Sequence, residues 1–453
     1  MTHITEHKRI HLIGIGGCSM SGLASILKNR GYYVQGSDRA ESPFTERLKE
    51  LGVPVFIGHD AKNIGDCDLI IFSAAIKSDN VERAEAKRRG IPELERSEAL
   101  GQLTEGYESV VGIAGCHGKT TITSMLALIC EQGGPDATVH IGGFVDFLNG
   151  GVRLGAHDMF ITEACEYVES FLTLRPTIAL INNIDNDHLD YYGDMEHIVA
   201  AFKKFAALLP ENGLLIGNTD DFRVRALMAE HTGRKLSYGM KDADYTPANI
   251  TYDDNGCPGF DIMFRGEKLM HIQLRIPGEH SVMNAIAAAA VAREIGADNK
   301  CIVSALNAFR NTRRRFEYYG ERNGVKYYHD YGHHPSEIAA TMKAASNVKH
   351  NKLFCVFQCN SYTRAKTLFL NDVTCFNLAD ETLVPDISPG REKDDGSVHA
   401  RDMVAAINAG GGHATYLGTF ENIRDYLDSH ANAGDLVVTI GSGDVYIQTK
   451  KLL

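Results

Sequence analysis

The sequence predicts an α/β protein built from parallel sheets and divided into three domains. Apolar, strand-like segments alternate with helical patterns along most of the chain, and this alternation is typical of βαβ units. Several of the segments run directly into Gly, Asn or Asp, at the sheet edge where open α/β folds bind their ligands. The length of 453 residues favours three domains at about 150 residues each.

Eight segments carry the strand pattern, and the helices between them follow from helical spacing. The expected strands are Arg9–Ile15, Leu69–Ser73, Val110–Ala114, Met159–Glu163, Ile178–Asn183, Leu214–Asn218, Leu353–Gln358 and Leu436–Ile440. An alanine-rich helix is expected over 281–295 and another up to about Phe309. A linker-like stretch at 103–108 and an arginine-rich stretch near 311–315 place the domains at 1–104, 105–312 and 313–453.

The composition is that of an ordinary globular protein. Apolar residues make up 44% and charged residues 23%, which excludes a largely disordered chain. The longest apolar run, 285–292, is far shorter than the roughly 20 residues that cross a bilayer. Glycines interrupt the apolar stretch after Lys8 and Arg9, so it does not resemble a signal peptide. We therefore expect a cytoplasmic protein without membrane insertion.

The charge balance and the cysteines exclude two further classes. Acidic residues number 58 against 46 basic ones, a net charge of −12, which argues against nucleic-acid binding. The one dense basic cluster, at 310–315, is large enough to hold a single phosphate group. The ten cysteines form no CxxC pair and no zinc-type spacing, so free thiols in a reducing compartment are expected.

The segment 110–121, Val-Val-Gly-Ile-Ala-Gly-Cys-His-Gly-Lys-Thr-Thr, is the most specific local signal. A strand, a tight glycine loop and then Lys-Thr at a helix start form a phosphate cradle. Backbone N–H groups and the helix dipole favour the anion, the lysine adds a charge, and the threonine hydroxyl can bind Mg²⁺. The full G-x-x-x-x-G-K-[ST] pattern is not met because Ile113 replaces its first glycine. The alternative is a glycine turn that caps an ordinary helix.

Two later strands end in candidate metal ligands. Glu163 closes the strand 159–163, in the manner of a carboxylate on a neighbouring strand of phosphate-loop enzymes. The segment Asn182-Asn-Ile-Asp-Asn-Asp-His188 offers hard oxygen ligands and one imidazole. His188 alone could equally be a turn residue bonded to backbone. Together with Lys119 and Glu163, it is predicted to bind metal.

A second glycine loop, Gly14-Ile-Gly-Gly-Cys-Ser-Met-Ser-Gly22, follows the first strand. It departs from the dinucleotide fingerprint at Ser19, where that pattern has glycine. Asp38 lies 24 residues after Gly14, where an acidic residue could bind a ribose hydroxyl. Alone, this loop suggests a nicotinamide dehydrogenase. Two nucleotide loops in one chain instead favour an enzyme that joins nucleotide-bearing substrates.

Taken together and in order, the motifs resemble the Mur ligase family, and within it the members that join L-alanine to UDP-N-acetylmuramate. The resemblance covers nearly the whole chain. The motifs that carry it are 14–22, Gly36-Ser-Asp38, Gly115-Cys-His-Gly-Lys-Thr-Thr121, Glu163-Ala-Cys-Glu166, Asn183-Ile-Asp-Asn-Asp-His188, Gly278-Glu-His-Ser-Val-Met-Asn284, Arg314-Arg-Phe316, Asp330-Tyr-Gly-His-His-Pro335, Arg391-Glu-Lys393 and Gly441-Ser-Gly-Asp444.

The resemblance implies an N-terminal Rossmann-like domain, a central phosphate-loop ATPase-like domain and a C-terminal Rossmann-like domain. It implies ATP, UDP-N-acetylmuramate and L-alanine as substrates, with Mg²⁺ at two sites, in peptidoglycan precursor synthesis. Lys119, Glu163 and His188 would be the catalytic residues, and Thr120, Glu163 and His188 the metal ligands. The residues expected to bind the UDP part are Gly16, Gly17, Ser37 and Asp38, and those expected to bind ATP are Gly115, Cys116, His117, Gly118, Lys119, Thr120, Thr121, His280, Asn284, Arg315 and Asp330.

Arg391 is the candidate for the amino-acid carboxylate, because a guanidinium binds a carboxylate bidentately. Its alternative is an exposed loop arginine. Without the family, Asn284 would be interpreted as a polar group at a helix start, and Arg314 and Arg315 as a solvated hinge.

The sequence departs from the family pattern at four places: Cys116 for threonine, Ser281 for asparagine, Cys18-Ser19 for a smaller pair, and Gln358-Cys-Asn-Ser361 for Gln-Pro-His. The first three are loop-backbone positions, whereas the last leaves residues 359–361 without an expected role.

Four alternatives stay open. A muropeptide-recycling ligase would carry Phe-Ala in place of Tyr331-Gly332, and a folylpolyglutamate-type ligase would lack the first domain with Gly36-Ser-Asp38. A nucleotide sensor has no need of Glu163 and His188 together, and Ser19 weighs against a dehydrogenase. The sequence does not predict the oligomeric state.

Overall fold

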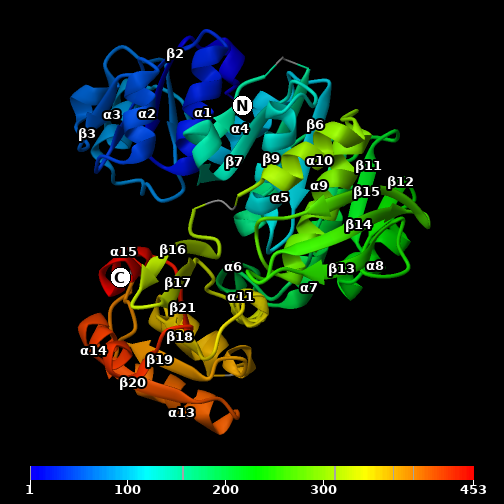
Figure 1. Cartoon of the computed structure of the whole chain (residues 1–453). Coiled ribbons are helices and arrows are strands. Elements are labelled where there is room, and N and C mark those ends of the chain that lie inside the picture. Colours follow the sequence, from blue (N-terminus) through cyan, green and yellow to red (C-terminus); the bar gives the residue numbers. More distant parts are fainter. Residues whose placement is uncertain (1, 156–157, 311–312, 371, 391) are drawn as a thin grey trace. The chain divides into compact units, whose positions relative to one another are not determined.

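The computed structural model describes residues 2–155, 158–310, 313–370, 372–390 and 392–453, and its strands form three sheets (Figure 1). Parallel pairing dominates in the strand pairs recorded for each sheet, and helices form most connections, which confirms the predicted α/β class. All eight strands expected from the sequence are present, each within two residues of its expected bounds.

The first sheet is parallel, with the strand order β3-β2-β1-β4-β5. This is the expected Rossmann-like order, and it reverses beside β1, where doubly wound sheets bind ligands. Its strands are β1 (Arg9–Ile13), β2 (Tyr33–Asp38), β3 (Val55–Ile57), β4 (Leu69–Phe72) and β5 (Glu93–Glu95), and its helices are α1 (Cys18–Asn29), α2 (Pro43–Glu50), α3 (Val81–Arg89) and α4 (Arg96–Thr104). Helix α2 begins where Ser42 forms a capping box and Pro43 occupies the first turn.

The second sheet has ten strands in the order β15-β14-β13-β12-β11-β10-β6-β9-β7-β8. Its centre is parallel, and β8 runs antiparallel to β7. The strands are β6 (Ser109–Ala114), β7 (Thr138–Val145), β8 (Gly150–Arg153), β9 (Met159–Glu163), β10 (Ile178–Ile181), β11 (Leu214–Asn218), β12 (Arg234–Tyr238), β13 (Tyr245–Tyr252), β14 (Pro258–Phe264) and β15 (Glu267–Gln273). The helices are α5 (Lys119–Glu131), α6 (Leu189–Tyr192), α7 (Met195–Ala206), α8 (Phe222–Glu230), α9 (Glu279–Glu294) and α10 (Asn299–Ala308).

The third sheet has the order β16-β17-β21-β18-β19-β20 and is parallel except for β16. It has the expected α/β architecture, with its own strand order: the last strand lies between β17 and β18. The strands are β16 (Glu317–Arg322), β17 (Val325–Asp330), β18 (Leu353–Phe357), β19 (Glu381–Pro385), β20 (Ala414–Gly418) and β21 (Leu436–Ile440). The helices are α11 (Pro335–Asn347), α12 (Tyr362–Arg364), α13 (Ala400–Ala409), α14 (Phe420–His430) and α15 (Val445–Leu452).

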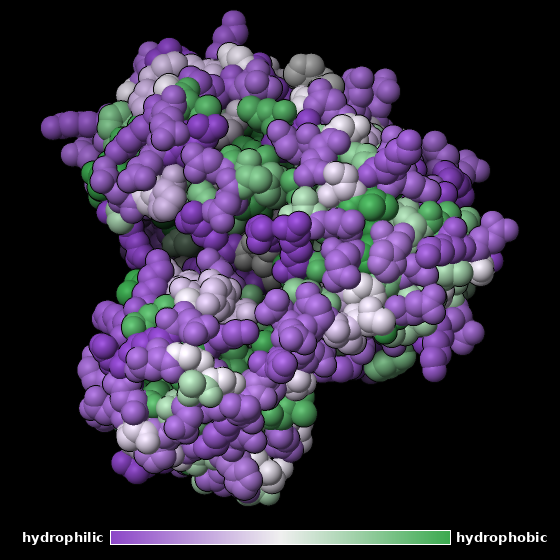
Figure 2. Space-filling view, in the orientation of Figure 1, coloured by the Kyte–Doolittle hydropathy of each residue, from purple (hydrophilic) through white to green (hydrophobic). Residues whose placement is uncertain are grey.

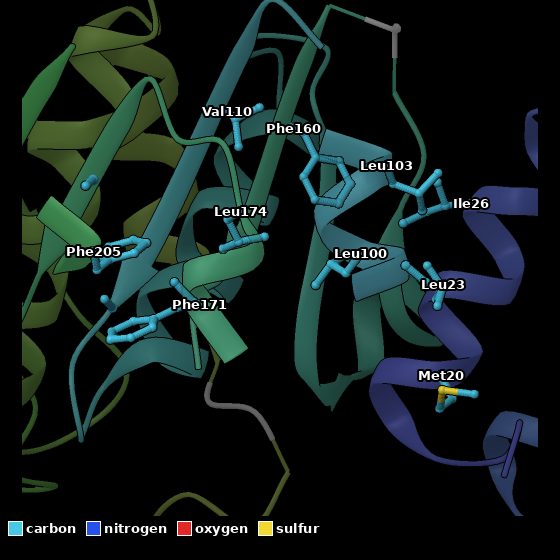
Figure 3. Close-up of a cluster of buried hydrophobic side chains, with 14 of the residues drawn as sticks. Met20, Leu23, Ile26, Leu100, Leu103, Val110, Phe160, Phe171, Leu174 and Phe205 are labelled. Carbon is cyan, nitrogen blue, oxygen red and sulfur yellow. The ribbon is translucent and has the colours of Figure 1, made fainter. Parts of the chain in front are cut away.

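One hydrophobic core joins the first sheet to the second. Figure 3 shows Met20, Leu23 and Ile26 of α1 on one side and Leu100 and Leu103 of α4 on the other. The same cluster continues through Val110, Phe160, Phe171, Leu174 and Phe205 of the second sheet and its helices. The third sheet has separate cores on its two faces.

This shared core is reflected in how the chain divides. One compact unit contains Met1–Pro247, Ile262–Met270 and Asn284–Leu306, and the other contains Ala248–Asp261, His271–Met283 and Asn307–Leu453. The first unit therefore holds the whole first sheet and most of the second. The domain boundaries at 104/105 and 312/313 stay predictions.

The surface is largely hydrophilic, as Figure 2 shows for one face, where apolar side chains form only small patches. Within the described ranges, no helix combines the length and apolarity that crossing a membrane requires. All ten cysteines are free, as expected, and eight of them are buried.

Candidate active site

The phosphate loop connects β6 to α5 and depends on two glycines. Gly115 has φ +136° and Gly118, which precedes the helix, has φ +86°, a region that side chains rarely adopt. A Cβ on Gly118 would lie 2.5 Å from Asn182 Nδ2 and 2.8 Å from Asn284 Oδ1. Both glycines are therefore required by conformation, and Gly118 also by close contact.

The segment after β10 braces this loop. The backbone N–H of His117 donates to Asn183 Oδ1 at 2.8 Å, and its carbonyl accepts from Asn182 Nδ2 at 2.9 Å. The Cys116 thiol lies 3.4 Å from the Asp185 carbonyl and accepts from the Asp185 N–H at 3.2 Å. The cysteine thus forms one donor and one acceptor contact with Asp185, and a hydroxyl has the same donor and acceptor capacity.

Lys119 pairs with a carboxylate that the sequence did not single out. Its Nζ donates to both oxygens of Glu166, at 2.9 and 2.8 Å, and to the carbonyls of Gly115 and Cys116. Glu166 is 2% exposed. Burial opposes the charge on Lys119, but the Glu166 carboxylate outweighs it and raises the pKa of the lysine. The signal in the sequence was present, because Glu166 closes the motif that begins with Glu163.

Thr120 and Glu163 meet at the start of α5. The Thr120 hydroxyl donates to Glu163 Oε2 at 3.0 Å, and the Gly142 N–H donates to Glu163 Oε1. A Cβ on Gly142 would lie 2.8 Å from Glu163, so this glycine lets the carboxylate lie close to β7. A hydroxyl and a carboxylate at the start of a phosphate-loop helix are ligands that Mg²⁺ prefers beside phosphate. These two residues fit the expected metal.

His188 lies with two carboxylates, those of Glu166 and Asp187. Donor atoms of His188, Glu166 and Asp187 all lie within 4.8 Å of one another. The His188 ring also contacts the Tyr167 ring, with centroids 4.7 Å apart, and His188 itself has φ +56°. The predicted ligands therefore form two groups, Thr120 with Glu163 and His188 with Glu166 and Asp187, and their binding of metal stays a prediction.

The first glycine loop is closed by Asp38. Its Oδ2 accepts from the Gly16 N–H at 2.8 Å, and a Cβ on Gly16 would lie 2.7 Å from Thr45 Cγ2 and 2.9 Å from Asp38 Oδ2. Gly17 precedes α1, so the loop ends at a helix N-terminus with free N–H groups. The arrangement is that of an anion site.

The side chain of Ser37 points away from this loop, towards Glu82. The side chain is fully buried, and its hydroxyl donates to Glu82 Oε2 at 2.5 Å. The predicted part of Ser37 in binding UDP stays a prediction, and its hydroxyl is already bonded to Glu82. Ser37 shapes the loop through its carbonyl oxygen, which accepts from the N–H groups of Gly14 and Ile15 at 2.8 and 3.0 Å.

Glu82, which no sequence signal identified, is the centre of a buried network under the loop. Besides Ser37 it contacts His11, at 3.5 Å, and His59, at 3.3 Å, and it accepts from Asn63 Nδ2 at 2.7 Å. Burial alone would raise the pKa of Glu82, but hydrogen bonds from His11, Ser37 and Asn63 lower it to about 2. The carboxylate is thus held ionised inside the first domain.

The predicted residues of the third domain lie at the start of that domain. Asp330 is 6% exposed, and its two oxygens accept from the N–H groups of Phe316 and Gly332, each at 2.7 Å. Phe316 has φ +40°, so this bond holds a strained segment in place. Arg315 lies beside Glu337, at 3.4 Å. Asp330 therefore anchors the backbone next to Arg315.

The remaining predicted residues are placed as follows. Asn284, in α9, lies against Gly118 of the phosphate loop, and His280, in the first turn of the same helix, is exposed. Gly17 and His117 lie in the two loops described above, and Thr121 lies in the first turn of α5. Arg391 lies outside the described residues, so its role stays a prediction.

Comparison with known proteins agrees with this geometry. Three family models match consecutive parts of the chain: "Mur ligase family, catalytic domain" over 9–108, "Mur ligase middle domain" over 113–292 and "Mur ligase, glutamate ligase domain" over 314–443. The chain belongs to the Mur ligase family. The three-domain fold expected from the sequence is thereby confirmed.

Individual relatives extend this result. The UDP-N-acetylmuramate–L-alanine ligase of Alkaliphilus metalliredigens is 44% identical over 454 positions, covering 100% of this chain and 98% of that protein. The crystal structure of the Thermotoga maritima UDP-N-acetylmuramate-alanine ligase has a TM-score of 0.80 at 26% identity, covering 98% of each chain. A murein peptide ligase structure from Psychrobacter arcticus has a TM-score of 0.69 at 24% identity, covering 98% of each chain, and this likeness concerns the fold alone.

Proposed function

We propose that this Mur ligase is an ATP-dependent enzyme that joins L-alanine to the lactyl carboxylate of UDP-N-acetylmuramate through an acyl phosphate, in peptidoglycan precursor synthesis. The observation that carries the proposal is the phosphate loop 115–121 with its Thr120–Glu163 pair. It occurs in a chain that is 44% identical, over its full length, to a protein named for this reaction.

The chemistry follows from the reactants. A carboxylate resists attack by an amine because oxide is a poor leaving group. Transfer of the γ-phosphoryl group of ATP to the lactyl oxygen turns that oxygen into part of a phosphate leaving group. The α-amine of L-alanine then attacks the carbonyl carbon, and phosphate leaves as the amide bond forms. The enzyme supplies positioning and charge stabilisation.

Within this scheme, the loop Gly115–Thr121 surrounds the ATP phosphates, the N–H groups at the start of α5 donate to them, and Lys119 neutralises their charge. Mg²⁺ held by Thr120 and Glu163 would offset further charge on the phosphate oxygens. When Lys119 moves to the phosphates, the buried Glu166 loses its partner, and an unpaired buried carboxylate is costly. We therefore assign the second cation to Glu166, Asp187 and His188, which are close enough together to hold one.

The first domain supplies the other nucleotide site. The N–H groups in the first turn of α1 suit the diphosphate of UDP, and Asp38 holds the loop at Gly16 and Gly17 in place for it. Since both ATP and a UDP-linked sugar are consumed, we propose a cytoplasmic location.

We further propose that His280, Asn284 and Arg315 contact ATP, with Asp330 positioning the backbone beside Arg315. Arg391 is our candidate for the carboxylate of L-alanine.

The test is phosphate release from ATP with UDP-N-acetylmuramate and one amine substrate at a time. L-alanine should give the highest kcat/KM. Glycine should remain detectable, because one missing methyl changes binding by only about 1–3 kcal/mol. An L-alanyl-γ-D-glutamyl tripeptide should give no turnover. Equal turnover with alanine and the tripeptide would refute the proposal in favour of a muropeptide-recycling ligase, and no release with any amine would refute ligation.

A further inference from the structure

A buried histidine, His140 of β7, links the two nucleotide loops of the first compact unit. It is 3% exposed. Its Nε2 lies 3.1 Å from the carbonyl oxygen of Ser19 and 3.3 Å from the Ser19 hydroxyl, in the first turn of α1. Its Nδ1 lies 3.2 Å from the Thr162 hydroxyl in β9. One ring therefore contacts the helix that follows the first glycine loop and the strand that delivers Glu163.

The contacts fix the tautomer. Because a carbonyl oxygen can only accept, Nε2 must carry the proton that it donates to Ser19. Burial lowers the pKa of His140 to about 4, so the ring is neutral at physiological pH and Nδ1 is an acceptor. The single proton of the Thr162 hydroxyl is then shared between Nδ1, at 3.2 Å, and the Glu163 carbonyl oxygen, at 3.1 Å. The direction of the Nε2 bond is determined by its carbonyl partner.

The packing around the ring leaves it little freedom. A Cβ on Gly22 of α1 would lie 2.7 Å from His140 Cδ2, so the ring lies directly on the helix backbone. Arg96 Nη1 donates to the Ser19 hydroxyl at 3.3 Å, and the Cys18 thiol lies 3.5 Å from the Ile141 carbonyl. The first turn of α1 is thus fixed to β7 at successive residues.

The other side of the ring leads to the metal ligand. His140 and Thr162 are partners in the parallel pairing of β7 and β9. The Thr162 hydroxyl also lies 3.1 Å from the Glu163 carbonyl, and the Gly142 N–H two residues after His140 donates to the Glu163 carboxylate. The His140 ring, the Thr162 hydroxyl and Glu163 therefore lie next to one another along the paired strands β7 and β9.

We infer that His140 is a positioning residue for the ligation: it fixes the distance between the diphosphate-binding turn of α1 and the Glu163 carboxylate, and hence between the two substrates that must react. This inference rests on the proposed function. A displacement of about 1 Å between reacting groups lowers a rate about 100-fold without requiring any loss of affinity.

The main test is His140→Phe, which keeps the ring and removes both hydrogen bonds. We expect kcat for ligation to fall about 10- to 100-fold, while calorimetric Kd values for UDP-N-acetylmuramate and for a non-hydrolysable ATP analogue change less than about threefold. His140→Gln, whose amide nitrogen can take the place of Nε2, should recover most of kcat. Thr162→Val should reproduce part of the loss of kcat. It should add little in combination with His140→Phe, because both substitutions remove the same contact between Nδ1 and the Thr162 hydroxyl.

Thr449→Val is the matched control. Thr449 is buried in α15 and its hydroxyl lies 2.6 Å from that of Thr439, so this variant also loses a buried hydrogen bond. It should lower the melting temperature and leave kcat unchanged.

A kcat in His140→Phe equal to that of the Thr449 control would overturn the inference, as would a loss confined to UDP-sugar affinity. In both cases the wild-type enzyme still ligates. A wild-type protein that does not ligate L-alanine to UDP-N-acetylmuramate would instead refute the proposed function, and the positioning role with it.

Discussion

Replacing Gly118 by alanine tests how closely the phosphate loop is packed. The backbone at Gly118 has φ +86°, which costs an alanine about 1–2 kcal/mol. The new Cβ would also lie 2.5 Å from Asn182 Nδ2. Asn182 cannot move freely, because it donates to the His117 carbonyl at 2.9 Å and accepts from the Tyr238 hydroxyl at 2.6 Å. Breaking such a buried arrangement costs about a further 1–3 kcal/mol.

Gly133 provides the matched comparison at the other end of α5. It has φ +102°, but a Cβ there would meet nothing within 4 Å. Gly133→Ala therefore carries only the conformational cost. The difference in free-energy cost between the two variants is the part that comes from crowding against Asn182. That difference of about 1–3 kcal/mol corresponds to about 5- to 150-fold in a binding constant.

Calorimetric titration with a magnesium complex of a non-hydrolysable ATP analogue measures this difference. We expect Gly118→Ala to bind the analogue about 5- to 150-fold more weakly than Gly133→Ala, because binding energy is used to restore the loop. UDP-N-acetylmuramate affinity should be unchanged in both variants. Equal affinities of the two variants for the analogue would show that the contacts of Asn182 do not maintain the loop.

Three further predictions follow from the same geometry. Lys119→Ala should abolish ligation and leave UDP-sugar affinity near the wild-type value in calorimetry, and a parallel loss of that affinity would contradict separate sites. His188→Ala should raise the Mg²⁺ concentration needed for half-maximal ligation more than it raises the KM for L-alanine, and an unchanged metal titration would leave His188 a turn residue. Glu82→Gln should destabilise the first domain at neutral pH by about 3 kcal/mol, since the pKa of Glu82 is lowered to about 2. Because folding lowers that pKa, the difference in unfolding free energy between the wild type and Glu82→Gln should be complete above about pH 4.5 and shrink as the pH falls towards 2. Denaturant midpoints of the two proteins that differ equally at pH 7 and pH 3 would refute this.

Residues with a local signal were predictable from the sequence. Buried parallel strands are continuous apolar runs, so β6, β9 and β21 could be located closely. The phosphate loop followed from glycines and Lys-Thr at fixed spacing. Two polar strands of the second sheet were not predicted, β13 between β12 and β14 and β15 at the sheet edge, because their exposed residues interrupt the apolar pattern.

Contacts between distant segments were not predictable. Glu82 lies 45 positions from its partner Ser37, and nothing in α3 distinguishes it from Glu85, the other acidic residue of that helix. Glu166 could have been predicted, since a second carboxylate in the motif of Glu163 can face the loop lysine. Gly142 carried a weaker signal, because paired glycines in a strand indicate close approach by another group.

The core shared by the first two sheets has a consequence for synthesis on the ribosome. Met20, Leu23 and Ile26 of α1 pack against residues from α4 and beyond, so the first domain cannot complete its core when residue 104 is made. Its apolar face is covered only after Phe160 and Phe171 have been synthesised, more than fifty residues later. A chain released after the first domain should therefore aggregate, whereas one released after α10 should remain dispersed. The amino-terminal half of this ligase is, in folding terms, one module with two glycine loops.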